Sequence, residues 1–292
     1  MPLSAPIHWR GVTLLEEHEI APTCEVYLVG CPLSCPYCAV PGASRGEGGV
    51  EHLAPTALVE DLRDPRHPPF RALSLVGGEP TLHLDWIRAL LPIARAHLPG
   101  TLMVLNTALC WEPELAPELA AGFDWVVGTV RTWGPDCALG APAGYPAQAR
   151  AAAEALLAAG GRLLLRILVL PGHLDCCARP LAAWTAGLSG EVRVSVLRNY
   201  APVGAARGIA GLDRLLHDAE RSAELLPPGV RRPLAHPIEP IPQRGPDCVD
   251  PPVTLEIDPQ GRVFAPFVTG DLLPWLAERA PELRPRLAYL GR

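Results

Sequence analysis

Six short apolar runs restrict the folds that are open to this chain. Each is seven to nine residues long, and together they cover residues 24–30, 71–77, 101–107, 124–130, 162–170 and 191–198. Their residues are almost continuously apolar instead of alternating with polar ones, which indicates strands that are buried on both faces, as in a parallel sheet. We therefore expect six β-strands at these positions.

Helical patterns accompany the apolar runs along the chain. They are expected at residues 55–63, 83–98, 113–121, 147–159, 179–188 and 210–225. A chain that alternates strand and helix in this way is typical of the α/β class, either as an open doubly wound sheet or as a full or partial barrel. Both architectures gather functional side chains at the carboxyl ends of their strands, so we expect one site at that edge.

Length and composition limit the kinds of protein that this chain can be. Its 292 residues, 49% of them hydrophobic, suffice for one large α/β domain or two small ones. A net charge of −6 argues against a nucleic-acid or membrane surface. The most apolar run is interrupted by Arg166 and is too short to span a bilayer. No secretory signal is seen, so we expect the nine cysteines to lie in a reducing cytoplasm.

The chain changes character near residue 230. Residues 236–252 are proline-rich and predict a linker or wrapping loop, whereas residues 254–266 predict a hairpin with its turn at 258–261. A terminal helix is expected at 272–280. We thus divide the chain into an N-terminal extension (1–23), a central barrel (24–235) and a C-terminal extension (236–292) that covers or flanks the barrel mouth.

Three cysteines follow the first apolar run with the spacing C-x3-C-x2-C: Cys31, Cys35 and Cys38. A structural zinc ion takes four cysteine or histidine ligands. Its fourth ligand would come from a distant residue such as Cys24, His52 or Cys248. Packing of buried cysteines is a second alternative. We favour a third, a [4Fe–4S] cluster, in which three thiolates leave one iron free for a ligand that is not protein.

The cysteine motif, with the aromatic Tyr37 before its last cysteine, and the sequence GGEPT at residues 77–81 together resemble the radical S-adenosylmethionine (SAM) superfamily. The resemblance covers residues 20–235. It implies a partial (β/α)6 TIM-type barrel, here with a C-terminal hairpin and helix as an extension. It also implies that the three cysteines hold a [4Fe–4S] cluster, that SAM chelates the free iron, and that reductive cleavage gives a 5′-deoxyadenosyl radical that abstracts hydrogen from a substrate.

The same resemblance implies a set of SAM-binding residues. Glycines allow a ligand to approach the backbone closely, and their carbonyls together with a carboxylate can accept from the ammonium group of SAM. A proline after the carboxylate could fix that turn through a cis peptide bond. The residues expected to bind SAM are Tyr37, Gly77, Gly78, Glu79, Pro80, Asn106, Thr107, Arg131, Arg166 and His173.

Several members of this set have an ordinary structural alternative. Arg166 either clamps the SAM carboxylate or forms a salt bridge that offsets its burial. Asn106 and Thr107 either contact SAM or simply end a strand, and His173 either contacts a ligand or is a loop histidine. Arg131 stands where the pyruvate formate-lyase activating enzyme has the lysine of an Asp-x-Lys pair. Because Thr129 replaces the acid of that pair, this chain departs from the pattern.

Two segments, LVLPGH at 168–173 and NYAPVGAARG at 199–208, resemble the PflX-like proteins near that activating enzyme. A glycyl radical enzyme is then a possible protein substrate, a small metabolite being the alternative. A flavodoxin- or ferredoxin-type electron donor is implied in both cases. A non-catalytic iron–sulfur or zinc protein is less favoured, because electron carriers use four cysteines per cluster and need no GGEPT segment.

An auxiliary cluster is a further hypothesis. Cys176 and Cys177 could help to ligate one, together with Cys137 or Cys248. Against it, adjacent cysteines seldom both bind one cluster, and the sequence has no second compact motif.

Overall fold

A computed structural model gives the fold of most of the chain. The structure describes residues 3–13, 16–17, 19–46, 49–65, 67, 69–134, 137, 139, 141–142, 144–198, 200, 202 and 204–232, with the backbone alone at 239–240, 256–257 and 263–264.

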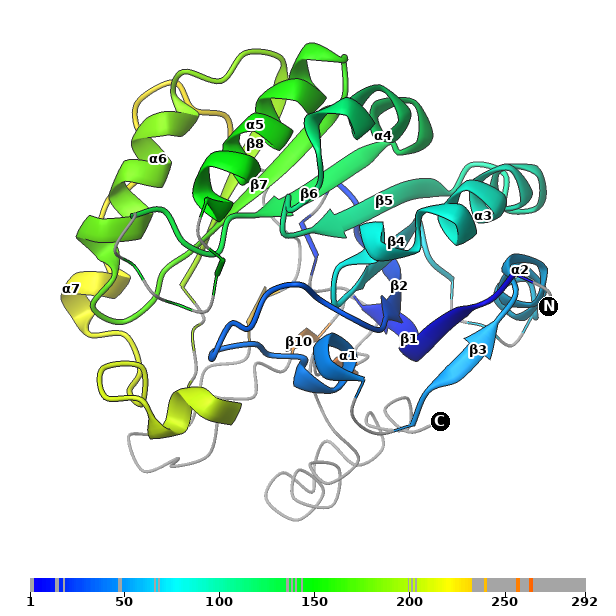
Figure 1. Cartoon of the computed structure of the whole chain (residues 1–292), viewed down its shortest axis with the longest axis horizontal. Helices are drawn as coiled ribbons and strands as arrows, with labels where there is room; N and C mark the ends of the chain where they lie inside the picture. Colours follow the sequence, from blue (N-terminus) through cyan, green and yellow to red (C-terminus); the bar gives the residue numbers. More distant parts are fainter. Residues whose placement is uncertain are drawn as a thin grey trace.

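One eight-stranded sheet forms the centre of the molecule (Figure 1). Its strands are β1 (Ala5–Thr13), β2 (Thr23–Leu28), β3 (Glu51–Leu53), β4 (Ala72–Gly77), β5 (Leu102–Thr107), β6 (Trp125–Thr129), β7 (Arg162–Leu168) and β8 (Glu191–Leu197). They lie in the order β3-β1-β2-β4-β5-β6-β7-β8, and β2 and β4 to β8 are mutually parallel. These six are the predicted strands, so the partial barrel is confirmed, and β3 and β8 are the edges of a sheet that does not close.

Helices connect the parallel strands and cover the outer face of the sheet (Figure 1). The α-helices are α1 (Pro41–Arg45), α2 (Pro55–Leu62), α3 (Leu84–His97), α4 (Ala116–Gly122), α5 (Tyr145–Ala158), α6 (Arg179–Thr185) and α7 (Asp218–Arg221). Short 3-10 turns are η1 (Pro80–His83), η2 (Pro113–Leu115) and η4 (Gly204–Gly208), and η3 (Leu174–Ala178) is a π-helical turn. The first five helices predicted from sequence correspond to α2 to α6.

The helix expected at residues 210–225 is wrong, since only α7 forms there. Gly211 has a φ of +92°, which a right-handed helix cannot include, and its N–H donates to the side chain of Asp213. Short polar side chains compete with a helix for such backbone groups. The chain therefore turns at 209–217 instead of winding.

Strands β1 and β3 were not predicted. β1 belongs to the segment assigned above to the N-terminal extension and pairs antiparallel with β2, with Ile7 opposite Leu28. β3 pairs antiparallel with the start of β1. Polar and apolar residues mix in both strands, and the pairing that defines them is made across the sheet.

The apolar core has two layers. The larger lies between the outer face of the sheet and the helices; there Trp86, Ile87 and Leu90 of α3 are almost completely buried. The smaller lies on the inner face, where Ile20 packs with residues such as Val127 and Leu164. The near-continuous hydrophobicity of the strands follows from this burial on both faces.

In the C-terminal segment, β10 (Glu256–Ile257) and β11 (Val263–Phe264) pair antiparallel, which confirms the predicted hairpin. β9 (Glu239–Pro240) pairs with β10. The predicted helix at 272–280 and the rest of the C-terminal extension lie outside the described residues. In the part of the chain that is described, no helix has both the length and the hydrophobicity to cross a bilayer.

A buried cluster of ion pairs lies on the inner face of the sheet. Arg166 follows Leu164 on the inward side of β7, and its guanidinium donates to both Glu16 and Glu17, with Nε 2.9 Å from Glu17 Oε1. Its side chain is only 11% exposed. The two glutamates lie on the connection between β1 and β2, so this contact ties that connection to the far side of the sheet.

We expect Arg166→Met to destabilise the fold by about 3–5 kcal/mol, because it leaves two buried carboxylates without their cation. Urea unfolding under anaerobic conditions would measure this loss. Arg232→Met breaks an exposed pair with Glu224 and should cost less than about 1 kcal/mol. Equal costs for the two variants would contradict this role of Arg166.

Candidate functional site

The three-cysteine loop begins directly after β2. Cys31, Cys35 and Cys38 are half-buried free thiols, and the N–H of Cys38 donates to the carbonyl of Cys35 at 3.2 Å. Leu33 and Tyr37 between them are buried and anchor the loop in the core. Buried apolar side chains thus alternate with half-buried cysteines along the loop, which leaves the three sulfur atoms partly accessible.

Arg131, which follows β6, lies next to this loop. The hydroxyl of Tyr37 donates to the carbonyl of Arg131 at 2.7 Å. Burial opposes a charge on Arg131, but Cys35 and the tyrosines Tyr37 and Tyr145 nearby keep its pKa above the ordinary value. The structure therefore places a cation beside the predicted thiolates, where it would favour their charged form.

Without a metal, burial raises the pKa of the thiols at Cys31 and Cys35, to about 11 for Cys31. Metal ligation by cysteine requires the thiolate, so binding would release protons here.

Gly77 and Gly78 bring the end of β4 against the end of β2. The N–H of Gly78 donates to the carbonyl of Leu28 at 2.9 Å, and that of Glu79 donates to the carbonyl of Gly30 at 2.7 Å. A Cβ on Gly78 would lie 1.9 Å from the carbonyl oxygen of Gly30. Only glycine allows this approach, which holds the GGEPT turn beside the start of the three-cysteine loop.

Glu79 is 1% exposed, and its carboxylate accepts several hydrogen bonds from the chain. Oε1 accepts from the hydroxyls of Thr81 (2.7 Å) and Thr107 (2.8 Å), and Oε2 from the N–H of Ala108 (2.9 Å) and the thiol of Cys110 (3.3 Å). These bonds join the end of β4 to the end of β5. The expected contact of Glu79 with an ammonium group would be made in addition to this set of donors.

We expect Glu79→Gln to lower the free energy of unfolding by about 1–3 kcal/mol, because an amide NH2 replaces one acceptor and leaves a buried donor unpaired. Thermal unfolding monitored by circular dichroism would show the shift. Glu118→Gln, at an exposed side chain that pairs with Arg88, serves as the matched control and should shift the transition far less.

The remaining residues predicted to bind SAM separate into different environments. Thr107 is buried on Glu79, Asn106 is half-buried at the end of β5, and Pro80 is buried at the start of η1. Among the described residues the one cis peptide bond is Ala21–Pro22, so Glu79–Pro80 is trans. Arg166 has the salt-bridge partners described above. A role for it toward SAM would require those pairs to open.

His173 belongs to a second group of candidate metal ligands, which is distant in sequence from the GGEPT turn. Its Nδ1 is 3.3 Å from the sulfur atoms of both Cys137 and Cys176, and Cys177 completes the group. The sequence suggests a grouping of Cys176 and Cys177 with Cys137 or Cys248, and the structure selects Cys137 and adds His173. Cys137 is 36 residues before His173, so the spacing of residues along the chain does not predict this group.

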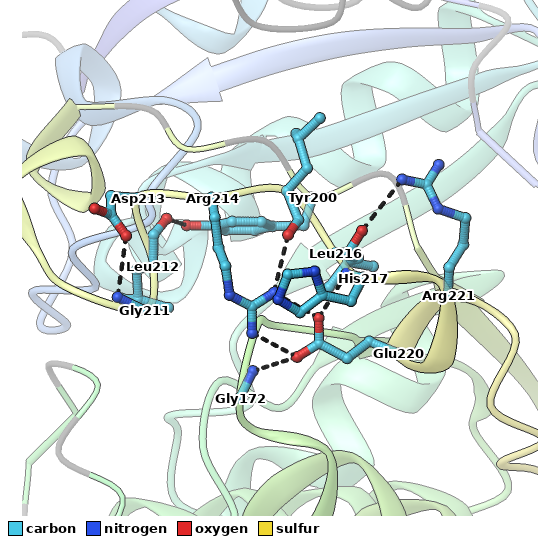
Figure 2. Close-up of polar contacts among 11 residues, drawn as sticks. Gly172, Tyr200, Gly211, Leu212, Asp213, Arg214, Leu216, His217, Glu220 and Arg221 are labelled. Carbon is cyan, nitrogen blue, oxygen red and sulfur yellow. Dashed lines mark hydrogen bonds and ion pairs between the residues drawn. The ribbon is translucent and has the colours of Figure 1, made fainter. Parts of the chain in front are cut away.

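The loop that carries His173 is held by Glu220 (Figure 2). The Glu220 carboxylate accepts from the N–H of Gly172 at 2.6 Å, from the guanidinium of Arg214 at 2.7 and 2.9 Å, and from the N–H of His217 at 2.8 Å. The Arg214 contact, with the backbone donors, lowers the pKa of Glu220 to about 2. Figure 2 also shows the hydroxyl of Tyr200 donating to the carbonyl of Leu212 within the segment that follows β8. The contact of Glu220 with Gly172 fastens this segment to the loop after β7.

Three free thiols on one loop, beside a glycine turn at the carboxyl edge of a parallel sheet, fit a [4Fe–4S] cluster that keeps one iron free. This fold and donor set define an iron–sulfur protein of the α/β class. The model of the radical SAM superfamily matches residues 26–184, more than half of the chain, and the chain belongs to that superfamily. It is an enzyme, and its cofactors are a [4Fe–4S] cluster and SAM.

Individual proteins show more distant likenesses. The chain is 34% identical over 102 residues to 7-carboxy-7-deazaguanine synthase of Methanothermobacter thermautotrophicus, a match over 34% of this chain and 38% of that protein. QueE from Escherichia coli has a TM-score of 0.46 at 15% identity, covering 68% of this chain and 86% of that one. Methylornithine synthase (PylB) has a TM-score of 0.47 at 18% identity, covering 62% and 53% respectively.

Proposed function

We propose that this enzyme abstracts a hydrogen atom from a small molecule bound at the carboxyl edge of the sheet. The observation that carries the proposal is the position of the three free thiols of Cys31, Cys35 and Cys38 directly beside the Gly77–Gly78 turn. The bound cluster and SAM supply a 5′-deoxyadenosyl radical by one-electron reduction. The chain itself supplies ligands, orientation and exclusion of water.

Each part of the chain has a proposed task. The three cysteines hold the cluster, while Tyr37 and Arg131 fix the shape and charge of their loop. The main chain at Gly77 and Gly78, which lies against the end of β2, is the proposed contact for the methionine part of SAM. Asn106 is a candidate polar contact to SAM from the next strand.

Two observations support a small substrate. The loops after β7 and β8 are fastened to each other through Glu220, and the loop after β6 contacts the loop after β7, because the N–H of Trp133 points to the sulfur of Cys177 at 3.4 Å. Loops joined in this way are held together along one side of the carboxyl edge, which suits a small substrate better than a protein segment. The partial match to a protein named 7-carboxy-7-deazaguanine synthase points to the same class of substrate.

A glycyl radical enzyme as protein substrate is the second candidate, favoured by the segments 168–173 and 199–208 that resemble PflX-like proteins. Either function needs an electron donor of the flavodoxin or ferredoxin type and a reducing compartment such as the cytoplasm, which we include in the proposal.

The first test is formation of 5′-deoxyadenosine by anaerobically reconstituted protein with dithionite and SAM. We expect product, and its absence with a fully loaded cluster would overturn the proposed hydrogen abstraction. The second test adds either the ultrafiltrate or the macromolecular fraction of cells that express the protein. Stimulation by the ultrafiltrate supports a small substrate. Stimulation by the macromolecules alone, together with a glycyl radical signal in electron paramagnetic resonance, supports the protein substrate instead.

A further inference from the structure

We propose that Cys137, His173, Cys176 and Cys177 form a second metal site, and that it binds a single zinc ion. Their four ligand atoms all lie within 4.8 Å of one another. The residues come from the loop after β6, the loop after β7 and the turn η3, so a metal there would join two neighbouring loops at the carboxyl edge of the sheet.

The distances between the ligand atoms are close to, or up to about 0.6 Å shorter than, those around one tetrahedral ion. The sulfur atoms are 3.2 Å apart for Cys137 and Cys177, 3.7 Å for Cys176 and Cys177, and 3.9 Å for Cys137 and Cys176. An ion with zinc–sulfur bonds of about 2.3 Å separates tetrahedral sulfur ligands by about 3.8 Å and sulfur from nitrogen by about 3.6 Å. The two distances from His173 Nδ1 to sulfur are both 3.3 Å.

These distances favour a single ion over the auxiliary [4Fe–4S] cluster that the sequence left open, as far as the four residues are concerned. A [4Fe–4S] cluster takes each thiolate on a different iron, so its sulfur ligands diverge around a cube and do not meet at one point. The separations are also far longer than the 2.03–2.05 Å of a disulfide bond. Three thiols and one imidazole form the Cys3His donor set of structural zinc sites, which have no open position.

The turn η3 explains how two adjacent cysteines face one point. The N–H groups of Cys177 and Ala178 both donate to the carbonyl of His173, each at 3.2 Å, which widens the backbone by one residue. π-helical turns of this kind occur often at functional sites. The widened turn places Cys176 and Cys177 on the same side as the His173 ring.

Neighbouring segments contact the four candidate ligands and hold their loops in place. Gly134 passes so close to η3 that a Cβ there would lie 2.9 Å from the carbonyl oxygen of Cys176. The N–H of Trp133 points to the sulfur of Cys177, and such N–H contacts stabilise a thiolate bound to metal. The anchor of Gly172 on Glu220 fixes the loop of His173 from the other side (Figure 2).

A zinc ion here would act on structure, because all four of its positions are taken by protein. It would fix the loop after β6, whose Arg131 contacts Tyr37 of the three-cysteine loop. The second site would thus hold in place the cationic side of the first, without itself taking part in the reaction.

The test measures zinc and iron by mass spectrometry in protein purified anaerobically in a phosphine reductant. We expect about one zinc and about four iron atoms per chain. Cys176→Ser, at the most exposed of the four ligands, should lower zinc by about tenfold or more and leave iron unchanged. Cys35→Ala should do the reverse, and Cys24→Ala, in strand β2, should keep both metals.

Cobalt substitution gives a spectroscopic readout that is independent of activity. Added Co2+ should produce the intense visible bands of tetrahedral thiolate coordination in wild type and not in Cys176→Ser. The proposal is overturned if neither zinc nor cobalt binds, if iron rises to about eight atoms per chain, or if peptide mapping finds a disulfide between these cysteines. Failure of SAM cleavage with zinc still bound would contradict the proposed function alone.

Discussion

Cys35→Ala should remove the cluster and the cleavage of SAM together. Two thiolates from Cys31 and Cys38 cannot hold a cube whose fourth iron is already free of protein, so iron is lost and not merely shifted. Loss of a hydrogen-bond partner beside a metal ligand already costs about 10–100-fold in affinity or activity, and we expect loss of the ligand itself to cost at least about 100-fold. The measurements are the brown absorbance, iron content and 5′-deoxyadenosine formed.

The control is Cys24→Ala, seven residues before Cys31 and completely buried on the outer face of β2. It removes a sulfur atom from the same region without touching the motif, so absorbance and product formation should persist. A Cys35→Ala protein that kept its full iron content and turnover would contradict the ligand assignment.

Gly78→Ala should prevent the native fold at the carboxyl edge. Its Cβ would overlap the carbonyl oxygen of Gly30 at 1.9 Å and the carbonyl carbon at 2.5 Å. Both contacts are with backbone, which cannot rotate aside as a side chain can, so β2 and β4 would have to separate. We expect a loss above about 5 kcal/mol, beyond the usual range for one substitution, seen as insoluble protein or as a collapsed urea midpoint.

Gly49→Ala is the matched control, because a Cβ at Gly49 would meet no atom within 4 Å and its φ is not positive. It should fold and bind the cluster as wild type does. A soluble Gly78→Ala protein with an unchanged urea midpoint would show that the close approach of the two strands is not required.

The parallel strands β2 and β4 to β7 could be predicted because most of their residues are buried, on both faces of the sheet, and therefore carry the apolar signal. β7 illustrates this, since Leu163 packs toward the helices and Leu164 toward the inner face. β1 lacks such a signal, and its strand form depends on pairing with β2 and β3. The turn near Gly211 was expected to be helical, whereas the positive φ of Gly211 and its contact with Asp213 decide its shape.

The predicted cluster site and the proposed zinc site likewise differ in whether the sequence alone reveals them. Cys31, Cys35 and Cys38 lie within eight residues, so one loop supplies all the predicted ligands, and the sequence by itself indicated the cluster and the family. Cys137 and His173 are separated by a helix and a strand, and only the packing of adjacent βα units brings them within 3.3 Å. The same is true of Arg166, whose partners Glu16 and Glu17 lie about 150 residues away along the chain. Local spacing can be read directly from the sequence, whereas contacts between distant segments form only when the strands have paired in their order in the sheet.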